Sequence, residues 1–198
     1  MQYVNQRWFD RHDALLMARG ASSRNPIVDP KGEVVAWVMN GGIKAPLRTV
    51  LQPSERLVRL GQSGMPSQVV QGAWWLRFSE YRKVELFANR RQLPMQVAVR
   101  LLCAVPLEWS SMDTVVQARV KSPLLAYEGV GAPAIQRHQK TKTVEFLDAL
   151  AEGAGNPVSQ LFIPGLGSGD VRHDALMVEG YGHLPPEQSR SGYIIRPC

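Results

Sequence analysis

The sequence lacks most of the residues and motifs that identify a known chemistry. Its 198 residues include only two cysteines, Cys103 and Cys198, and four histidines. So few cysteines imply no disulfide framework, and reduced thiols are expected. The chain contains no P-loop, no nucleophile elbow, no zinc-ligand spacing and no dinucleotide-binding glycine motif. No metal site is therefore predicted, and no Ser-His-Asp or Cys-His arrangement follows from the spacing.

Long apolar runs are also missing. No segment approaches the ~20 apolar residues that cross a bilayer, and the charged first 13 residues lack the apolar core of a secretory signal. We therefore expect a cytoplasmic protein without membrane contact. Hydrophobic residues make up 44% and charged residues 20% of the chain, as in an ordinary globular protein. Residues 1–198 are expected to form a single domain.

Positive charge is concentrated in the middle of the chain. The formal net charge is +6 and the pI is about 9.6. Residues 56–100 hold eight basic residues against two acids, Glu80 and Glu85, a surplus equal to that of the whole chain. The eight are Arg56, Arg59, Arg77, Arg82, Lys83, Arg90, Arg91 and Arg100. This balance favours an anionic partner such as a phosphate, a dinucleotide, a nucleic acid or an acidic protein face, although a solvated basic surface explains it equally well.

Short apolar segments predict more strands than helices. We expect strands at 57–60, 73–77, 114–120, 124–127, 158–164, 175–178 and 192–195, and a hairpin over 27–39 with its turn at 29–32. Helices are expected at 7–19, after Ser79 and at 143–152, while 95–105 fits either state. Strands and helices do not alternate, so the predicted fold class is α+β: a mostly antiparallel split sheet or sandwich with a few short helices.

The most informative stretch runs from residue 56 to residue 88. It reads as a strand that carries Arg59, a glycine-rich loop, a second strand with Trp74 and Trp75, and then Ser79 as the N-cap of a helix. This order would place a cation, aromatic faces and a hydroxyl around one cleft. Structural roles explain the same residues, because neighbours on a strand point to opposite faces and at least one tryptophan should lie in the core.

These residues resemble the motifs of the ADP-ribosyltransferase superfamily. Its members place an arginine on an early strand, then a strand with serine or threonine that leads into a helix, and later a glutamate motif on another strand. The matching segments are RLVRLG, GAWWLRFSEYRKVELFA and SQLFIPGL. The resemblance implies an enzyme of the toxin or effector kind that binds NAD and transfers ADP-ribose to a protein, a nucleic acid or water. The NAD-binding residues it implies are Arg59, Trp74, Trp75, Ser79, Tyr81 and Gln160.

The chain departs from the family at the glutamate. Gln160 takes the aligned position, and a neutral amide lacks the charge with which a carboxylate stabilises a developing oxocarbenium ion. Glu128, which follows another strand and precedes a glycine, is the other candidate for the acid. The resemblance thus implies Arg59, Ser79 and Glu128 as the catalytic set. If no carboxylate reaches the cleft, the fold would bind NAD without catalysis.

A second hypothesis rests on charge alone. A non-enzymatic binding or inhibitor protein, of the type that accompanies mobile genetic elements, would dock its basic residues on an acidic protein or a nucleic acid. Its binding would weaken steeply with salt and ignore NAD. A nucleic-acid-processing enzyme of another fold is a third alternative, but the lack of clustered carboxylates or histidines disfavours a metal nuclease.

Overall fold

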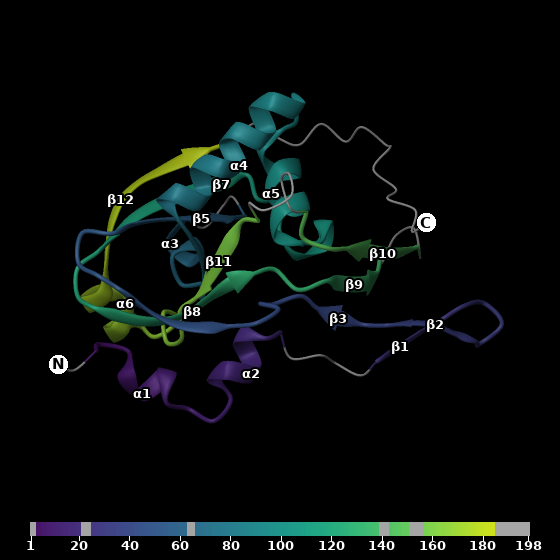
Figure 1. Ribbon diagram of the computed structural model, residues 1–198, viewed down its shortest axis with the longest axis horizontal. Helices are drawn as coiled ribbons and strands as arrows, with labels where there is room; N and C mark the ends of the chain where they lie inside the picture. Colours follow the sequence, from purple (N-terminus) through teal and green to yellow (C-terminus); the bar gives the residue numbers. More distant parts are fainter. Residues whose placement is uncertain (1–2, 21–24, 63–65, 139–142, 151–156, 185–198) are drawn as a thin grey trace.

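Seven antiparallel strands form the central sheet. The computed structural model describes residues 3–20, 25–62, 66–138, 143–150 and 157–184. The strands are β4 (Leu47–Leu51), β5 (Arg56–Gly61), β6 (Trp74–Arg77), β7 (Thr114–Val120), β8 (Leu124–Val130), β11 (Ser159–Phe162) and β12 (Leu176–His183). They lie in the order β12-β7-β5-β6-β11-β8-β4, and each neighbouring pair is antiparallel (Figure 1). The predicted α+β class with a mostly antiparallel sheet is confirmed.

The sheet is weakly joined at its centre. β6 pairs with β5 only through Leu76 with Val58 and Arg77 with Leu57, and it pairs with β11 over two residues as well. Beyond Val58, β5 continues along β7 as far as Gly61 but no longer pairs with β6. The backbones of β5 and β6 are therefore free to separate at Arg59, and this opening positions the candidate site.

Helices cover both faces of the sheet. They are α1 (Gln6–Phe9), α2 (Ala14–Ala18), α3 (Pro66–Val69), α4 (Phe78–Arg91), α5 (Met95–Cys103) and α6 (Gly169–Ala175), with the 3-10 turn η1 (Leu107–Trp109). Because successive strand residues point to opposite faces, Val58 and Leu76 pack on α4 and α5, whereas Leu57 and Trp75 belong to a second core that receives side chains from α1, α3 and α6. Two cores thus fix the central strands from both sides.

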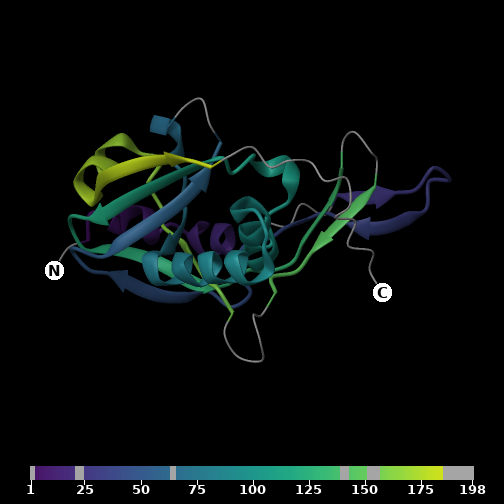
Figure 2. The ribbon, with the colours of Figure 1, turned by 90° about the horizontal axis from the view of Figure 1, so that it is seen from above.

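A smaller β-region extends away from the main sheet (Figures 1 and 2). β1 (Pro26–Val28) and β2 (Val34–Trp37) form the predicted hairpin, whose turn is closed by Asp29 Oδ1 accepting backbone N–H groups. Beside it, β3 (Met39–Asn40), β9 (Ala134–Arg137) and β10 (Val144–Leu147) form a three-stranded antiparallel sheet. The helix predicted at 143–152 is wrong over 144–147, because β10 pairs residue by residue with β9.

Three other segments can be compared with the prediction. The helix predicted at 7–19 is interrupted between α1 and α2. The ambiguous segment 95–105 is helical, and Pro94 precedes its first turn. The strand predicted at 175–178 begins one residue later, at Leu176, directly after the short helix α6. The strand predicted at 192–195 lies outside the described residues.

The start of α4 is two residues earlier than predicted. Tyr81, Val84, Phe87 and Ala88 form its buried face, as the sequence predicts. The N-cap, however, is Arg77 rather than Ser79, and Ser79 lies exposed in the first turn. The helix therefore follows β6 directly, without a loop that would turn the Ser79 hydroxyl back toward the sheet.

Replacing Gly42 by alanine should destabilise the fold far more than the same change at Gly32. Both glycines have positive φ, +98° and +86°, so alanine costs about 1–2 kcal/mol of backbone strain at either one. Only at Gly42 would the new methyl group meet backbone, 2.3 Å from the carbonyl carbon of Arg19, whereas Gly32 faces open space. Overpacking adds about 1–3 kcal/mol. Urea unfolding of both variants measures the difference, and equal losses would contradict the close approach of α2 to Gly42.

Candidate functional site

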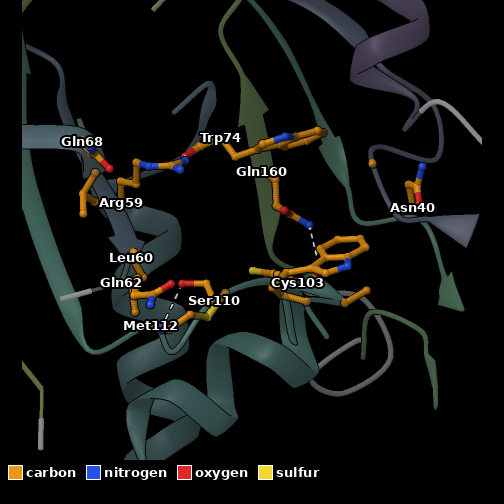
Figure 3. Close-up of a pocket in the computed structure, with 16 residues that line it drawn as sticks. Asn40, Arg59, Leu60, Gln62, Gln68, Trp74, Cys103, Ser110, Met112 and Gln160 are labelled. Atoms are coloured by element: carbon orange, nitrogen blue, oxygen red, sulfur yellow. Dashed lines mark hydrogen bonds between the residues drawn. The ribbon is translucent and has the colours of Figure 1, made fainter. Parts of the chain in front are cut away.

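A pocket of about 740 Å³ opens where β5 and β6 separate. Its wall is made by β5, α3, β6, the end of α5, the loop that follows α5, β11 and the end of β3 (Figure 3). The polar and aromatic side chains on this wall are Asn40, Arg59, Gln62, Gln68, Trp74, Trp109, Ser110 and Gln160. Among the described residues that line the pocket there is no Asp or Glu. The volume falls in the range of about 300–1,000 Å³ typical of small-molecule sites.

Arg59 is a largely buried cation without an acidic partner among the described residues. Its Nη1 donates to the Trp74 carbonyl oxygen at 2.5 Å, and its Nε has no hydrogen-bond partner there. Burial lowers the pKa of Arg59 to about 10, because desolvation disfavours the charged form. A guanidinium held in this way is stabilised by an anion, and a phosphate matches its fork of donors.

Gly72 makes the position of Arg59 possible. A Cβ at residue 72 would lie 1.9 Å from Arg59 Nη2, so any larger side chain would displace the guanidinium. Trp75, which is 2% exposed, donates its indole N–H to the Gly72 carbonyl oxygen at 2.8 Å. Trp75 was expected to bind NAD, but the structure places it in the core behind the site, where it fixes the segment that receives Arg59.

Gln160 projects into the pocket from β11. Figure 3 shows it between Trp74 and Cys103, and its Nε2 donates to the Cys103 carbonyl oxygen at 3.0 Å, at the last residue of α5. A Cβ at Gly131 would lie 2.6 Å from that nitrogen, so a larger residue there would displace the amide. The amide nitrogen is thereby occupied, while the amide oxygen accepts no hydrogen bond from a described residue.

The strand register separates the predicted site residues into two faces. Phe162 pairs with Trp74, and Gln160 lies two residues before it, so Trp74 and Gln160 share a face. Leu161 pairs with both Trp75 and Glu128, which therefore share the opposite face. Arg59, opposite Val116 of β7, belongs by register to the Trp75 face, but its guanidinium reaches the Trp74 carbonyl oxygen where β5 and β6 separate. Arg59, Trp74 and Gln160 therefore line one pocket, and Glu128 is not among its lining residues.

Glu128 belongs to an ion-pair cluster with Arg77. The Arg77 guanidinium donates from Nε and Nη2 to the two Glu128 carboxylate oxygens, at 3.1 and 3.2 Å, and also contacts Glu55 and the Thr49 hydroxyl. Burial opposes the charge of Arg77, but hydrogen bonding and attraction from Glu128 and Glu55 outweigh it and raise the pKa of Arg77 above its ordinary value. Glu128 therefore has a structural role, because its carboxylate balances the charge of Arg77.

Ser79 and Tyr81 also lie away from the pocket wall. Ser79 is exposed on α4, and Tyr81 is 7% exposed in the core that α4 forms with the sheet. Burial raises the pKa of Tyr81 to about 12, with a smaller contribution from Glu85. Neither residue is among those that line the site with Arg59.

Sequence reasoning missed five polar or aromatic wall residues: Asn40, Gln62, Gln68, Trp109 and Ser110. Gln62 and Gln68 lie within the segment between β5 and β6, Gln68 on α3, so they are close in sequence to the residues that were predicted. Asn40 and Trp109 come from segments far from β5 in the sequence. Only the fold brings them to the pocket.

The basic residues of 56–100 are largely compensated within the fold. Arg59 lines the pocket, and Arg100 is 5% exposed and bonded to backbone carbonyls. The ion pairs are Arg56–Glu179, Arg77–Glu128, Arg82–Glu85 and Lys83–Glu80. Local pairing of this kind weakens the case for one continuous basic face, and docking on a polyanion stays a prediction.

Comparison with known proteins gives only distant structural similarity. No protein-family model and no curated protein matches the sequence. A chain from the structure of Tne2 in complex with Tni2 is similar with a TM-score of 0.44 and 14% identity, covering 77% of this chain and 100% of that one. A chain from the complex of Rhs1-CT with its cognate immunity protein RhsI1 has a TM-score of 0.44 and 9% identity, covering 77% of this chain and 89% of that one.

Within the described residues, no helix has the length and apolar character needed to span a membrane.

Replacing Glu128 by glutamine should lower stability without changing the pocket. The variant leaves the half-buried Arg77 with one carboxylate fewer, and we expect a loss of about 1–2 kcal/mol in the free energy of unfolding. Asp148→Asn is the matched control, because Asp148 pairs with Lys44 and both side chains are well exposed, 43% and 57%, where such a pair contributes about 0.5 kcal/mol or less. Denaturant unfolding compares the two. A Glu128→Gln protein as stable as the control would contradict the structural role.

Proposed function

We propose that the pocket binds NAD and that the protein cleaves the bond between nicotinamide and ribose, passing ADP-ribose to water or another nucleophile. The observation that carries the proposal is Arg59: a partly buried guanidinium, without an acidic partner among the described residues, at the wall of a pocket that also holds aromatic faces. Such a cation favours a ligand with phosphate groups, and the adjacent indole favours one with a flat ring.

The other wall residues fit NAD in chemical type. Gln62, Gln68 and Asn40 carry both a donor and an acceptor, as needed to pair with a carboxamide or an adenine edge. The described wall has no carboxylate that would repel a diphosphate. The volume of about 740 Å³ also suits a small molecule.

Gln160 is the residue best placed to assist bond cleavage. Loss of nicotinamide leaves positive charge on the ribose. The negative end of a fixed dipole, such as an amide oxygen, stabilises that charge in a site that holds little water. The bond to Cys103 fixes the amide nitrogen of Gln160, so the oxygen is the end that remains for the ribose. In this scheme the C1′–N bond breaks, the bonding electrons leave with nicotinamide, a water oxygen adds to C1′, and a proton goes to solvent.

Arg59→Met should weaken NAD binding by about 10- to 100-fold, as expected for loss of a charge-assisted hydrogen bond. The fold should survive, because the methionine keeps an apolar stem and removes a buried charge that has no acidic partner among the described residues. Arg56→Met is the matched control, since Arg56 is on the same strand but exposed and paired with Glu179. Calorimetric titration with NAD measures both. Equal affinity in the two variants would refute the assignment of Arg59 to the phosphates.

Gln160→Ala should slow nicotinamide release by about 10²–10³-fold, the usual effect of removing one preorganised dipole, while NAD affinity changes little. Gln136→Ala, on β9 and outside the pocket wall, serves as the control. Proton NMR of free nicotinamide follows the reaction. Binding of NAD by the unaltered protein without nicotinamide release would disprove cleavage and leave NAD binding intact, whereas absence of binding would disprove both.

A further inference from the structure

We infer that Gly72 is a positioning residue of the proposed NAD site: the absence of a side chain at this position sets where the Arg59 guanidinium lies, and thereby sets the affinity for the phosphates of the ligand. The inference rests on the proposed function and deepens it. A Cβ at Gly72 would lie 1.9 Å from Nη2, 2.0 Å from Cζ and 2.5 Å from Nη1 of Arg59. The guanidinium therefore occupies the space that a side chain at residue 72 would take.

The backbone conformation of Gly72 does not itself require glycine. Its φ lies outside the positive range that L side chains rarely adopt, unlike the φ of Gly41 or Gly42. An alanine at such a position restricts the unfolded chain without straining the folded one, and by that effect alone it stabilises a protein. The three atoms nearest to an added Cβ all belong to Arg59, so contact with Arg59 is what distinguishes alanine from glycine here.

Hydrogen bonds hold the backbone on both sides of Gly72. Its N–H donates to the Val69 carbonyl oxygen at 3.3 Å, and its carbonyl oxygen accepts the indole N–H of Trp75 at 2.8 Å. The carbonyl oxygen of the next residue, Ala73, accepts the Ile163 N–H at 2.8 Å. Val69, Trp75 and Ile163 are each 5% exposed or less. Moving Gly72 away from Arg59 would therefore disturb packed neighbours and several hydrogen bonds.

The Arg59 guanidinium is the part that can move at lower cost. It lies at the end of a long side chain, where Nη1 donates to the Trp74 carbonyl oxygen and Nε has no partner among the described residues. Rotating it away from a new methyl group breaks that one bond. Gly72→Ala should therefore leave the fold intact but misplace the guanidinium, and a charge-assisted hydrogen bond to a phosphate depends on its alignment.

The test compares Gly72→Ala, Gly167→Ala, Arg59→Met and the double variant Gly72→Ala/Arg59→Met in calorimetric titrations with NAD. Gly167 is the matched control, because its φ is also outside the positive range and an added Cβ would lie at an ordinary 3.7 Å from the Gln71 carbonyl oxygen. Gly72→Ala should weaken NAD binding about tenfold, and Gly167→Ala should leave it unchanged. With methionine at residue 59 there is no guanidinium to displace, so the double variant should bind NAD as Arg59→Met does.

Urea unfolding of the two alanine variants shows which part of the structure has moved. Gly72→Ala and Gly167→Ala should have similar midpoints, because the new methyl group at residue 72 displaces only the end of a side chain. A midpoint for Gly72→Ala far below that of the control would show that the backbone has moved instead, and would refute the positioning role.

The binding results separate this inference from the proposed function. If the unaltered protein binds NAD and Gly72→Ala binds it equally well, the positioning role is refuted and NAD binding stands. If the double variant loses affinity by the product of the two single losses, Gly72 acts independently of Arg59 and the role is likewise refuted. If the unaltered protein binds no NAD, the proposed function and this inference both fail.

Discussion

The hydrogen bond from Arg59 to the Trp74 carbonyl oxygen joins two strands where their backbone ladder has ended. β5 and β6 pair only as far as Val58 and Leu76, and Arg59 Nη1 then reaches Trp74 across the opening. A side chain spans more distance than a backbone hydrogen bond, so the two strands separate without leaving that carbonyl unpaired. The same bond fixes the Arg59 guanidinium at the wall of the opening. The separation of β5 and β6 therefore accounts for both the pocket and its positive charge.

Removing the Arg59 guanidinium from water costs desolvation free energy, and its surroundings offset that free energy only in part. Desolvation lowers the pKa of Arg59 to about 10, and among the described residues one backbone carbonyl is its hydrogen-bond acceptor. Elsewhere in the same sheet Arg77 has Glu55 and Glu128 as partners, and its pKa is raised. Two arginines on adjacent strands thus show opposite behaviour: Arg77 is satisfied by the fold, while Arg59 retains donors for a ligand.

The sequence predicted the elements around the site better than the side chains in it. Strand positions 57–60 and 73–77 follow from local apolar pattern, and so does the buried face of α4. Arg59 and Trp74 were predicted from a strand, loop and strand pattern that needs no tertiary information, whereas Gln160 was expected only from the family resemblance. The choice between Glu128 and Gln160 depends on the register of β8 on β11, where a shift of one residue reverses the face. Trp109 depends on a buried bond from Arg100 to its loop, and no local pattern reports such a contact.

The neutral amide at residue 160 is consistent with the charge of the whole pocket. A carboxylate there would stabilise positive charge on a ribose more strongly than a dipole does, but it would also compensate Arg59 and repel the phosphates that Arg59 is suited to bind. With glutamine, the described wall carries one positive charge and no negative charge. The arrangement therefore favours binding of an anion over electrostatic stabilisation of a cation, and the proposed cleavage would depend on how closely the Cys103 carbonyl and Gly131 hold the Gln160 amide in place.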